Sequence, residues 1–228
     1  MKQTQYDRTE MLLGKEAFAR LREKRVLCFG LGGVGGHCAE SLARTGIRTI
    51  GLVDDDVVDL TNLNRQILAL HSSLGRQKTE VMRERIQDID PSIEVRAFPV
   101  RLTEENLDEF CLAEWDYIVD AIDDVPAKLA LIRCAVELGV PVISCMGTGN
   151  KMDPSRLQVA DLSKTHTCPL AKAVRKGLRE RGIANGVKVV FSDECPARSI
   201  PGKSPASNAF VPAGAGILMA SVVVSDLL

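Results

Sequence analysis

The chain has 228 residues, of which 45% are hydrophobic and 26% are charged, and its formal net charge is −1. This composition is that of a soluble globular protein, and the length is sufficient for one well-packed α/β domain. The near-zero net charge excludes a global attraction to nucleic acid or membrane, so any such contact would need a local patch of charge.

Seven cysteines are present, but no two of them form a C-x-x-C pair, which argues against a structural zinc site. Several lie in apolar stretches, as expected of buried thiols in a reducing cytosol. The first ten residues are too polar for a signal peptide, so we expect a cytoplasmic protein. Peripheral association of the C-terminal tail with a membrane is left open.

The N-terminal region, residues 1–24, is polar and then helical. Its expected apolar face consists of Met11, Leu12, Leu13, Phe18 and Leu21. Arg8 precedes that face by three residues, and its ordinary interpretation is a solvated charge.

Residues 26–66 are the most informative stretch of the chain. A buried strand at 26–29 leads into Gly30-Leu31-Gly32-Gly33-Val34-Gly35, which fits G-x-G-x-x-G and continues as a helix over 34–44. Glycine lets the backbone turn tightly and approach a phosphate, whose charge the helix N-terminus favours. A second strand at 49–53 ends at Asp54, about twenty residues past the turn, where such folds place an acid against a ribose hydroxyl. The stretch therefore predicts a nucleotide-binding half.

Strands and helices continue to alternate after this point. We predict helices at 77–90, 103–110 and 128–138 and strands at 94–98, 117–122 and 141–146. Such alternation indicates a Rossmann-like three-layer α/β fold, with a mostly parallel sheet and ligands at the strand carboxyl ends. Asp54, Asp123 and Gly147 all fall at such ends. The connection over 56–73 is too long for a simple turn and is a candidate functional loop.

The pattern changes beyond residue 150, where we expect an antiparallel extension. Strands are predicted at 156–161 and 188–191 with a helix at 170–181, and residues 195–207 read as a mobile loop. Residues 210–228 read as a strand or turn followed by a buried helix, because Pro212 and the two following glycines argue against a membrane span. We expect a single domain over 1–228, with a nucleotide-binding half at 1–150 and a substrate-facing half at 151–228.

The glycine motif alone does not separate a dehydrogenase from an ATP-using enzyme. Arg65 and Lys78 follow Asp54 closely, and such cations could neutralise a triphosphate, while Asp123 could hold Mg²⁺. Each residue has an ordinary alternative: solvated charge for the two cations and a helix cap for Asp123. Taken jointly, these alternatives explain the pattern poorly.

Six motifs in chain order resemble those of the ThiF/MoeB/HesA superfamily of adenylating enzymes, relatives of the ubiquitin-activating enzymes. They are Arg8-x-x-x-Leu12-x-Gly14, Gly30-x-Gly32-Gly33-Val34-Gly35, Asp54-x-Asp56, Asn62-x-x-Arg65-Gln66, Gly75-x-x-Lys78 and Asp120-x-x-Asp123. The nucleotide-binding residues that the resemblance implies are Gly30, Gly32, Gly33, Gly35, Asp54, Asp56, Asn62, Arg65, Gln66 and Lys78. The catalytic residues that it implies are Arg8, Arg65, Lys78 and Asp123, with Asp123 as the Mg²⁺ ligand. It also implies a homodimer in which Arg8 serves the neighbouring subunit's site.

Finer motifs resemble one branch, the TcdA (CsdL) group of tRNA threonylcarbamoyladenosine dehydratases. They include Asn64-Arg65-Gln66-Ile67-x-Ala69, Met146-Gly147-x-Gly149-Asn150-Lys151-x-Asp153-Pro154 and Pro169-Leu170-Ala171. The resemblance implies ATP-dependent cyclisation of N6-threonylcarbamoyladenosine beside the tRNA anticodon, and residues 151–228 would then face the tRNA. Cys168 departs from the pattern, because an aspartate is expected before Pro169, and we infer no catalytic thiol from it.

A basic cluster lies between Lys164 and Lys188, where Glu180 is the single acid. Its inner cations are Lys172, Arg175, Lys176, Arg179 and Arg181. Such a cluster can neutralise RNA phosphates, although a solvated helix face is an equally good reading of these residues alone.

Two alternatives to this function stay open. The first is adenylation of the C-terminal glycine of a ubiquitin-like sulfur carrier at the same ATP site, with Cys195 as a candidate thiol and cysteine-desulfurase or sulfur-acceptor proteins as partners. The second is a nucleotide-sensing or NAD-binding module, which would leave Arg8, Arg65 and Lys78 unexplained.

Overall fold

The computed structural model describes residues 3–197 and 205–228. The predicted mobile loop at 195–207 therefore lies partly outside the described residues. Seven strands form one sheet in the order β3-β2-β1-β4-β5-β7-β6. Their bounds are β1 Arg25–Phe29, β2 Thr49–Val53, β3 Glu94–Phe98, β4 Tyr117–Asp120, β5 Val142–Cys145, β6 Leu157–Asp161 and β7 Lys188–Ser192.

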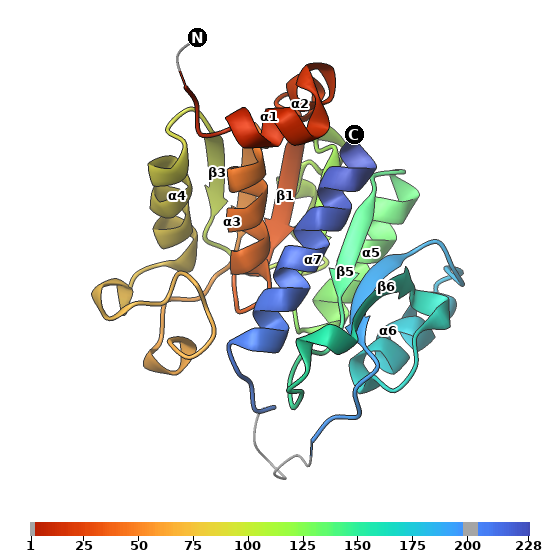
Figure 1. Ribbon diagram of the computed structural model, residues 1–228. Coiled ribbons are helices and arrows are strands. Elements are labelled where there is room, and N and C mark those ends of the chain that lie inside the picture. The colour runs from red at the N-terminus through yellow and green to blue at the C-terminus, as the bar shows by residue number, and fades with distance from the viewer. Residues whose placement is uncertain (1–2, 198–204) are drawn as a thin grey trace.

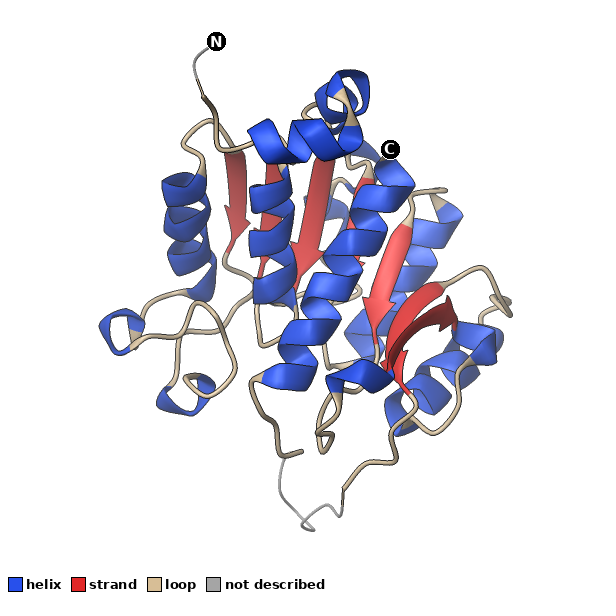
Figure 2. Ribbon diagram, in the orientation of Figure 1, coloured by secondary structure: helices blue, strands red, loops and turns tan. Residues whose placement is uncertain are grey.

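The sheet is parallel except at one edge, where β6 pairs antiparallel with β7. Helices cover both of its faces (Figure 2). This confirms the predicted Rossmann-like three-layer fold with an antiparallel C-terminal extension. The strand order reverses direction between β1 and β4, which is where such sheets leave a crevice at the carboxyl ends.

Seven α-helices are described. Their bounds are α1 Asp7–Leu13, α2 Lys15–Leu21, α3 Gly35–Thr45, α4 Lys78–Ile89, α5 Val125–Glu137, α6 Pro169–Arg179 and α7 Phe210–Leu227. One core cluster buries side chains from α3, α4 and α7 against the sheet, while two others bury those of α5 and α6. Helices α3, α4 and α7 thus lie on one face of the sheet and α5 and α6 on the other, while α1 and α2 lie at its amino-terminal edge (Figure 1).

The N-terminal helix is interrupted, contrary to the continuous apolar face expected there. Gly14 adopts φ +84° and donates its N–H to the carbonyl of Glu10, which ends α1. Met11 and Leu12 are 84% and 83% exposed, so only part of the predicted face is buried.

The prediction of an α-helix over 103–110 was wrong. Only a 3₁₀ turn at Leu107–Phe110 forms. The Asn106 side chain accepts the N–H of Thr103 and donates to the carbonyl of Arg101, and these local bonds replace the helical ones.

The C-terminal segment is one 18-residue helix, α7, and not a strand or turn followed by a helix. Pro212 is tolerated because it lies in the first turn, where its missing N–H has no helical partner. Gly216 allows close packing, since a Cβ there would lie 2.2 Å from the carbonyl oxygen of Val34. By length and composition α7 could span a membrane, but 44% of it is buried within the fold.

Candidate functional site

A pocket of about 400 Å³ opens at the carboxyl ends of β1, β2 and β4. Its wall contains Asp123 and nine of the ten predicted nucleotide-binding residues, namely Gly30, Gly32, Gly33, Asp54, Asp56, Asn62, Arg65, Gln66 and Lys78. The topology thus brings together predicted residues from Gly30 to Asp123 that are far apart in the sequence.

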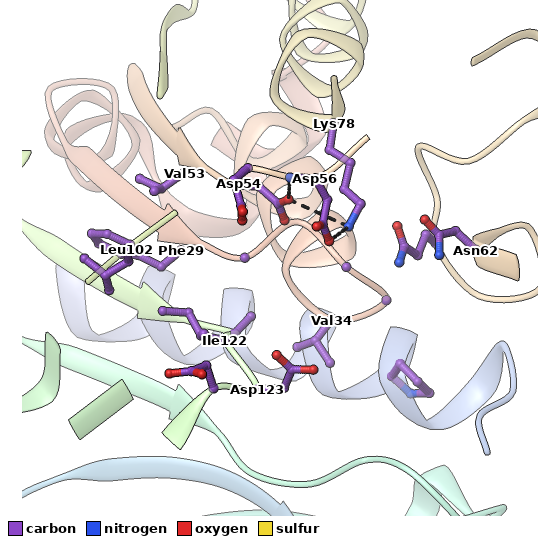
Figure 3. Close-up of a pocket in the computed structure, with 18 of the residues that line it drawn as sticks. Phe29, Val34, Val53, Asp54, Asp56, Asn62, Lys78, Leu102, Ile122 and Asp123 are labelled. Carbon is purple, nitrogen blue, oxygen red and sulfur yellow. Dashed lines mark hydrogen bonds and ion pairs between the residues drawn. The ribbon is translucent and has the colours of Figure 1, made fainter. Parts of the chain in front are cut away.

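The pocket has an apolar side and a polar side (Figure 3). Phe29, Val53 and Leu102 gather on one side, and Lys78 and Asn62 lie on the other. A ligand with a flat apolar part and a multiply charged part would match this polarity in only one orientation.

Two glycines make the tight turn after β1. A Cβ at Gly30, where φ is +82°, would lie 2.8 Å from the carbonyl oxygen of Ala121. A Cβ at Gly35 would lie 1.7 Å from the carbonyl oxygen of Gly30, so only glycine fits there. Gly35 is the one predicted nucleotide-binding residue outside the pocket wall, and its place is inside the turn. Gly32, by contrast, leaves its backbone open toward the pocket.

Asp54 fastens the glycine turn to the end of β2. Its Oδ2 accepts the N–H of Leu31 at 2.6 Å and its Oδ1 accepts the N–H of Asp56 at 2.9 Å. Burial raises the pKa of Asp54 above its ordinary value, and the Lys78 ammonium and the two N–H donors offset this only in part.

Lys78 begins α4 and is only 4% exposed, yet it lines the pocket. Its Nζ lies 2.6 Å from Oδ2 of Asp56 and 3.7 Å from Oδ1 of Asp54 (Figure 3). Two carboxylates therefore hold a buried ammonium at the polar side of the pocket.

The 60–66 turn supplies three further polar groups. Arg65 donates at 2.9 Å to the carbonyl of Thr61 and to Oδ1 of Asn64, and its stem packs against Gly33. Asn62 accepts the N–H of Asp59 and so fixes the turn. Within the described residues, Oε1 of Gln66 is a buried acceptor without a hydrogen-bond partner.

Asp123 lies in the pocket wall and does not cap α5. The cap is Asp124, whose Oδ1 accepts the N–H of Ala127 at 2.9 Å. The helix-cap interpretation of Asp123 is therefore set aside. Its carboxylate lies in the pocket wall below Ile122 (Figure 3), and a carboxylate oxygen is a ligand that Mg²⁺ accepts.

A buried ion pair underlies this wall, and sequence reasoning missed it. Lys128 is fully buried and donates to Oδ2 of Asp120 at 2.7 Å, to Oγ of Ser144 at 3.0 Å and to the carbonyl of Cys145 at 3.0 Å. Oδ1 of Asp120 accepts the N–H of Ile122, which turns the chain toward Asp123. Nothing in the periodicity distinguishes Lys128 from an exposed helical lysine.

Arg101, Thr148 and Ser207 are among the pocket residues that were also missed. Arg101 follows β3 and lies 3.5 Å from the carboxylate of Asp124, while Thr148 and Ser207 belong to irregular segments. Ser207 has no motif spacing that places it at the site, whereas Thr148 directly follows Gly147 at the carboxyl end of β5, where ligands were expected.

Arg8 does not join the pocket of its own chain. It lies exposed on α1, at the amino-terminal edge of the sheet, whereas the pocket lies at the carboxyl edge (Figure 1). Its predicted role thus depends on a second copy of the chain.

The predicted basic cluster lies on α6. Lys172, Lys176 and Arg179 are exposed, while the opposite face buries Ala171 and Val174. Cys168 caps this helix, since its Sγ accepts the N–H of Ala171 at 3.5 Å. A Cβ at Gly147 would lie 3.3 Å from that sulfur, so α6 begins beside the loop that contributes Thr148 to the pocket.

Comparison with known proteins gives consistent matches. The model of the ThiF family matches residues 6–227. A curated tRNA threonylcarbamoyladenosine dehydratase of Bacillus subtilis is 45% identical, with 98% of this chain and 94% of that protein covered. The crystal structure of the Escherichia coli enzyme of this name, TcdA, in complex with ATP superposes with a TM-score of 0.93 at 36% identity, covering 98% and 93% of the two chains. A sulfur carrier protein adenylyltransferase of Thermus thermophilus is 37% identical over only 58% of this chain.

Proposed function

This chain belongs to the ThiF family, and from that premise we propose that it dehydrates N6-threonylcarbamoyladenosine in tRNA to its cyclic form at the expense of ATP. The observation that carries the proposal is the polarised pocket, with the glycine turn and the buried Lys78 at its polar side. Near-full-length similarity to dehydratases of this name, one of them bound to ATP, supports the same activity.

The nucleotide fits the pocket in one orientation. The adenine lies against Phe29, Val53 and Leu102, and the phosphates lie toward Lys78 and Arg65. The open backbone of Gly32 faces the phosphates, whose charge the N-terminus of α3 also favours.

The chemistry needs no enzyme nucleophile. A carboxylate oxygen of the threonyl group attacks the α-phosphorus of ATP, the bond to pyrophosphate breaks, and an acyl-adenylate results. The ureido nitrogen of the same nucleoside then attacks the acyl carbon, AMP leaves, and the N–H proton passes to solvent. Because this nucleophile is tethered to the electrophile, proximity supplies much of the rate of the second step. The protein positions groups and stabilises phosphate charge.

Mg²⁺ fits the carboxylate donors of this wall, and we assign Asp123 as its ligand. The metal would neutralise phosphate charge beside Lys78 and Arg65. The carboxylate of Asp123 supports this assignment because it is not used as a helix cap.

The tRNA would contact α6. This helix begins beside the loop that contributes Thr148 to the pocket, and its exposed cations form a basic surface on a chain of nearly zero net charge. Replacing Lys172, Lys176 and Arg179 by alanine should weaken tRNA binding and flatten its dependence on salt, while ATP binding stays unchanged. A cytoplasmic location would follow from these two substrates.

Adenylation of a sulfur carrier is the second candidate. The partial coverage of the matching adenylyltransferase makes it the weaker one. Cys195 is exposed, so a thiol partner could reach it, and sulfur-acceptor proteins would be the corresponding partners.

Nucleoside mass spectrometry tests the proposal. The protein is incubated with ATP, Mg²⁺ and tRNA bearing threonylcarbamoyladenosine, and the tRNA is then digested. We expect an ATP-dependent loss of about 18 mass units, the mass of the water lost on ring closure, which is absent in the Lys78→Ala variant. AMP release that requires a ubiquitin-like protein, with an unchanged nucleoside, would move the assignment to the second candidate.

A further inference from the structure

Two irregular segments complete the pocket wall between the regular elements that flank them. One follows β5 and contributes Thr148, and the other precedes α7 and contributes Ser207. Their relative position must therefore be fixed by specific hydrogen bonds.

Asn150 takes part in three of these bonds, and the Nδ2 of Asn208 adds another by donating to the carbonyl of Lys151 at 2.7 Å. The N–H of Asn150 donates to the carbonyl of Ala206 at 2.7 Å, and its Oδ1 accepts the N–H of Ala206 at 2.8 Å. Its carbonyl also accepts the N–H of Ala197 at 2.6 Å. One residue thus fastens the segment after β5 to two separate points of the chain between β7 and α7.

Asparagine suits both the backbone conformation and the hydrogen bonding at position 150. Asn150 adopts φ +57°, a left-handed conformation that asparagine tolerates better than most residues, and it also provides the side-chain acceptor. The neighbouring Gly149 permits the approach, since a Cβ there would lie 2.6 Å from Cβ of Pro205.

The fastened wall stands on the phosphate side of the pocket. The carbonyl of Ser207 accepts from Nδ2 of Asn64 at 3.1 Å, next to Arg65. Pro212 lies 3.0 Å from where a Cβ of Gly33 would be. Phe29 and Leu102, which would face the base, lie on the other side.

We propose that Asn150 is a positioning residue for the acyl substrate. By holding Thr148 and Ser207 together, it shapes the wall where the threonyl carboxylate must meet the α-phosphate, and it leaves the base side unaffected. This inference rests on the proposed dehydratase activity. The substrate class of this site is then a modified nucleoside beside the anticodon of a tRNA.

The test compares four proteins in the mass-spectrometric assay, with ATP affinity measured separately in the absence of tRNA. Asn150→Ala loses the acceptor and strains the backbone, so kcat/KM for the modified tRNA should fall about tenfold, the effect of one lost hydrogen bond plus left-handed strain. Asn150→Asp keeps the acceptor and should retain near-normal turnover. Asn185→Ala, at an exposed asparagine on the β7 side of α6, is the matched control.

The expected signature is a loss in turnover of tRNA with an ATP dissociation constant changed by less than about twofold. An equal loss of ATP affinity, or equal activity of Asn150→Ala and Asn185→Ala, would overturn the inference. If Asn150→Ala does not fold, Asn150→Gly retains the left-handed backbone without the acceptor and must show the same selective loss. An inactive wild-type protein would instead refute the proposed function.

Discussion

Lys78 is a charged side chain placed by two other charged side chains, and this arrangement can be tested one residue at a time. Asp56 is exposed but lies 2.6 Å from the Lys78 ammonium. Its removal should misplace the cation without disturbing the core.

We expect Asp56→Asn to raise the KM for ATP about threefold, because one partly exposed charged contact is worth about 1 kcal/mol or less. The thermal unfolding midpoint should stay within about a degree, since the free energy of unfolding changes little. Steady-state kinetics at varied ATP gives the first quantity and calorimetry the second. Asp55→Asn, at the exposed neighbour, is the control, and an equal effect in both variants would contradict this role.

Tyr6 provides a pH-dependent test of the N-terminal packing. Its hydroxyl donates to Oδ2 of Asp90 at 2.8 Å, and burial together with that carboxylate raises the pKa of Tyr6 to about 12. A pKa raised on folding stabilises the protein below the unfolded value of 10, and this stabilisation is lost as the pH rises through about 12.

Tyr6→Phe should therefore be less stable than the wild type at pH 8, and the difference should shrink between pH 10 and pH 12. Denaturant unfolding of both proteins across this range measures it. A difference that is constant with pH would show that ionisation of Tyr6 has no part in it.

At the scale of whole elements, the strands and helices that have a regular pattern of apolar residues were predicted from the sequence. Five strands of the parallel sheet and the helices between them follow alternating apolar patterns, and their bounds were close to those observed. The 103–110 helix failed because the side chain of Asn106 competes for the backbone, an effect that no hydrophobic period reports. A buried helix was expected in the C-terminal segment, but the start of α7 at Phe210 was missed, because the close contact of Gly216 with Val34 exists only once α3 is in place.

The buried pair of Lys128 and Asp120 joins three elements, because it links β4, α5 and β5. Lys128→Met should destabilise the protein by about 3 kcal/mol or more, since it leaves the Asp120 carboxylate buried without its cation. Adding Asp120→Asn to that variant should recover part of the loss, because no uncompensated charge remains. Chemical denaturation of the wild type, the single variant and the double variant measures their free energies of unfolding. A double variant no more stable than the single one would contradict this explanation.

At the scale of the whole molecule, the candidate site was predictable as far as motif spacing reaches. Nine of the ten nucleotide-binding predictions line one pocket, because residues at parallel strand ends share an edge of the sheet. Thr148 follows Gly147 at the end of β5 and was within reach of this reasoning, whereas Arg101 and Ser207 lie in loops that have no repeating pattern. Arg8 is the opposite case, because its motif is recognisable but its place on α1 is remote from the pocket.

Because Arg8 is remote from the pocket of its own chain, its predicted role requires a dimer, and this can be tested. If Arg8 serves the neighbouring subunit in a homodimer, Arg8→Ala and Arg65→Ala should each be inactive alone. After mixing and subunit exchange, mixed dimers would hold one intact site, so up to about a quarter of the activity should return when exchange is random and each intact site works independently. Light scattering verifies the dimer and a differently tagged subunit verifies exchange. No recovery despite confirmed exchange would exclude a shared site.

The position of α7 also has a consequence for how the chain matures during synthesis. This helix follows every strand in the sequence, yet its Ala215, Met219 and Val223 complete the core over the same face as α3. β7 likewise arrives after β6 but must insert between β6 and β5. A nascent chain that has already formed β1 to β5 therefore carries an unpaired strand edge until β7 has emerged, and an uncovered apolar face until α7 has emerged. Chaperone capture and aggregation should accordingly be greatest before α7 has emerged.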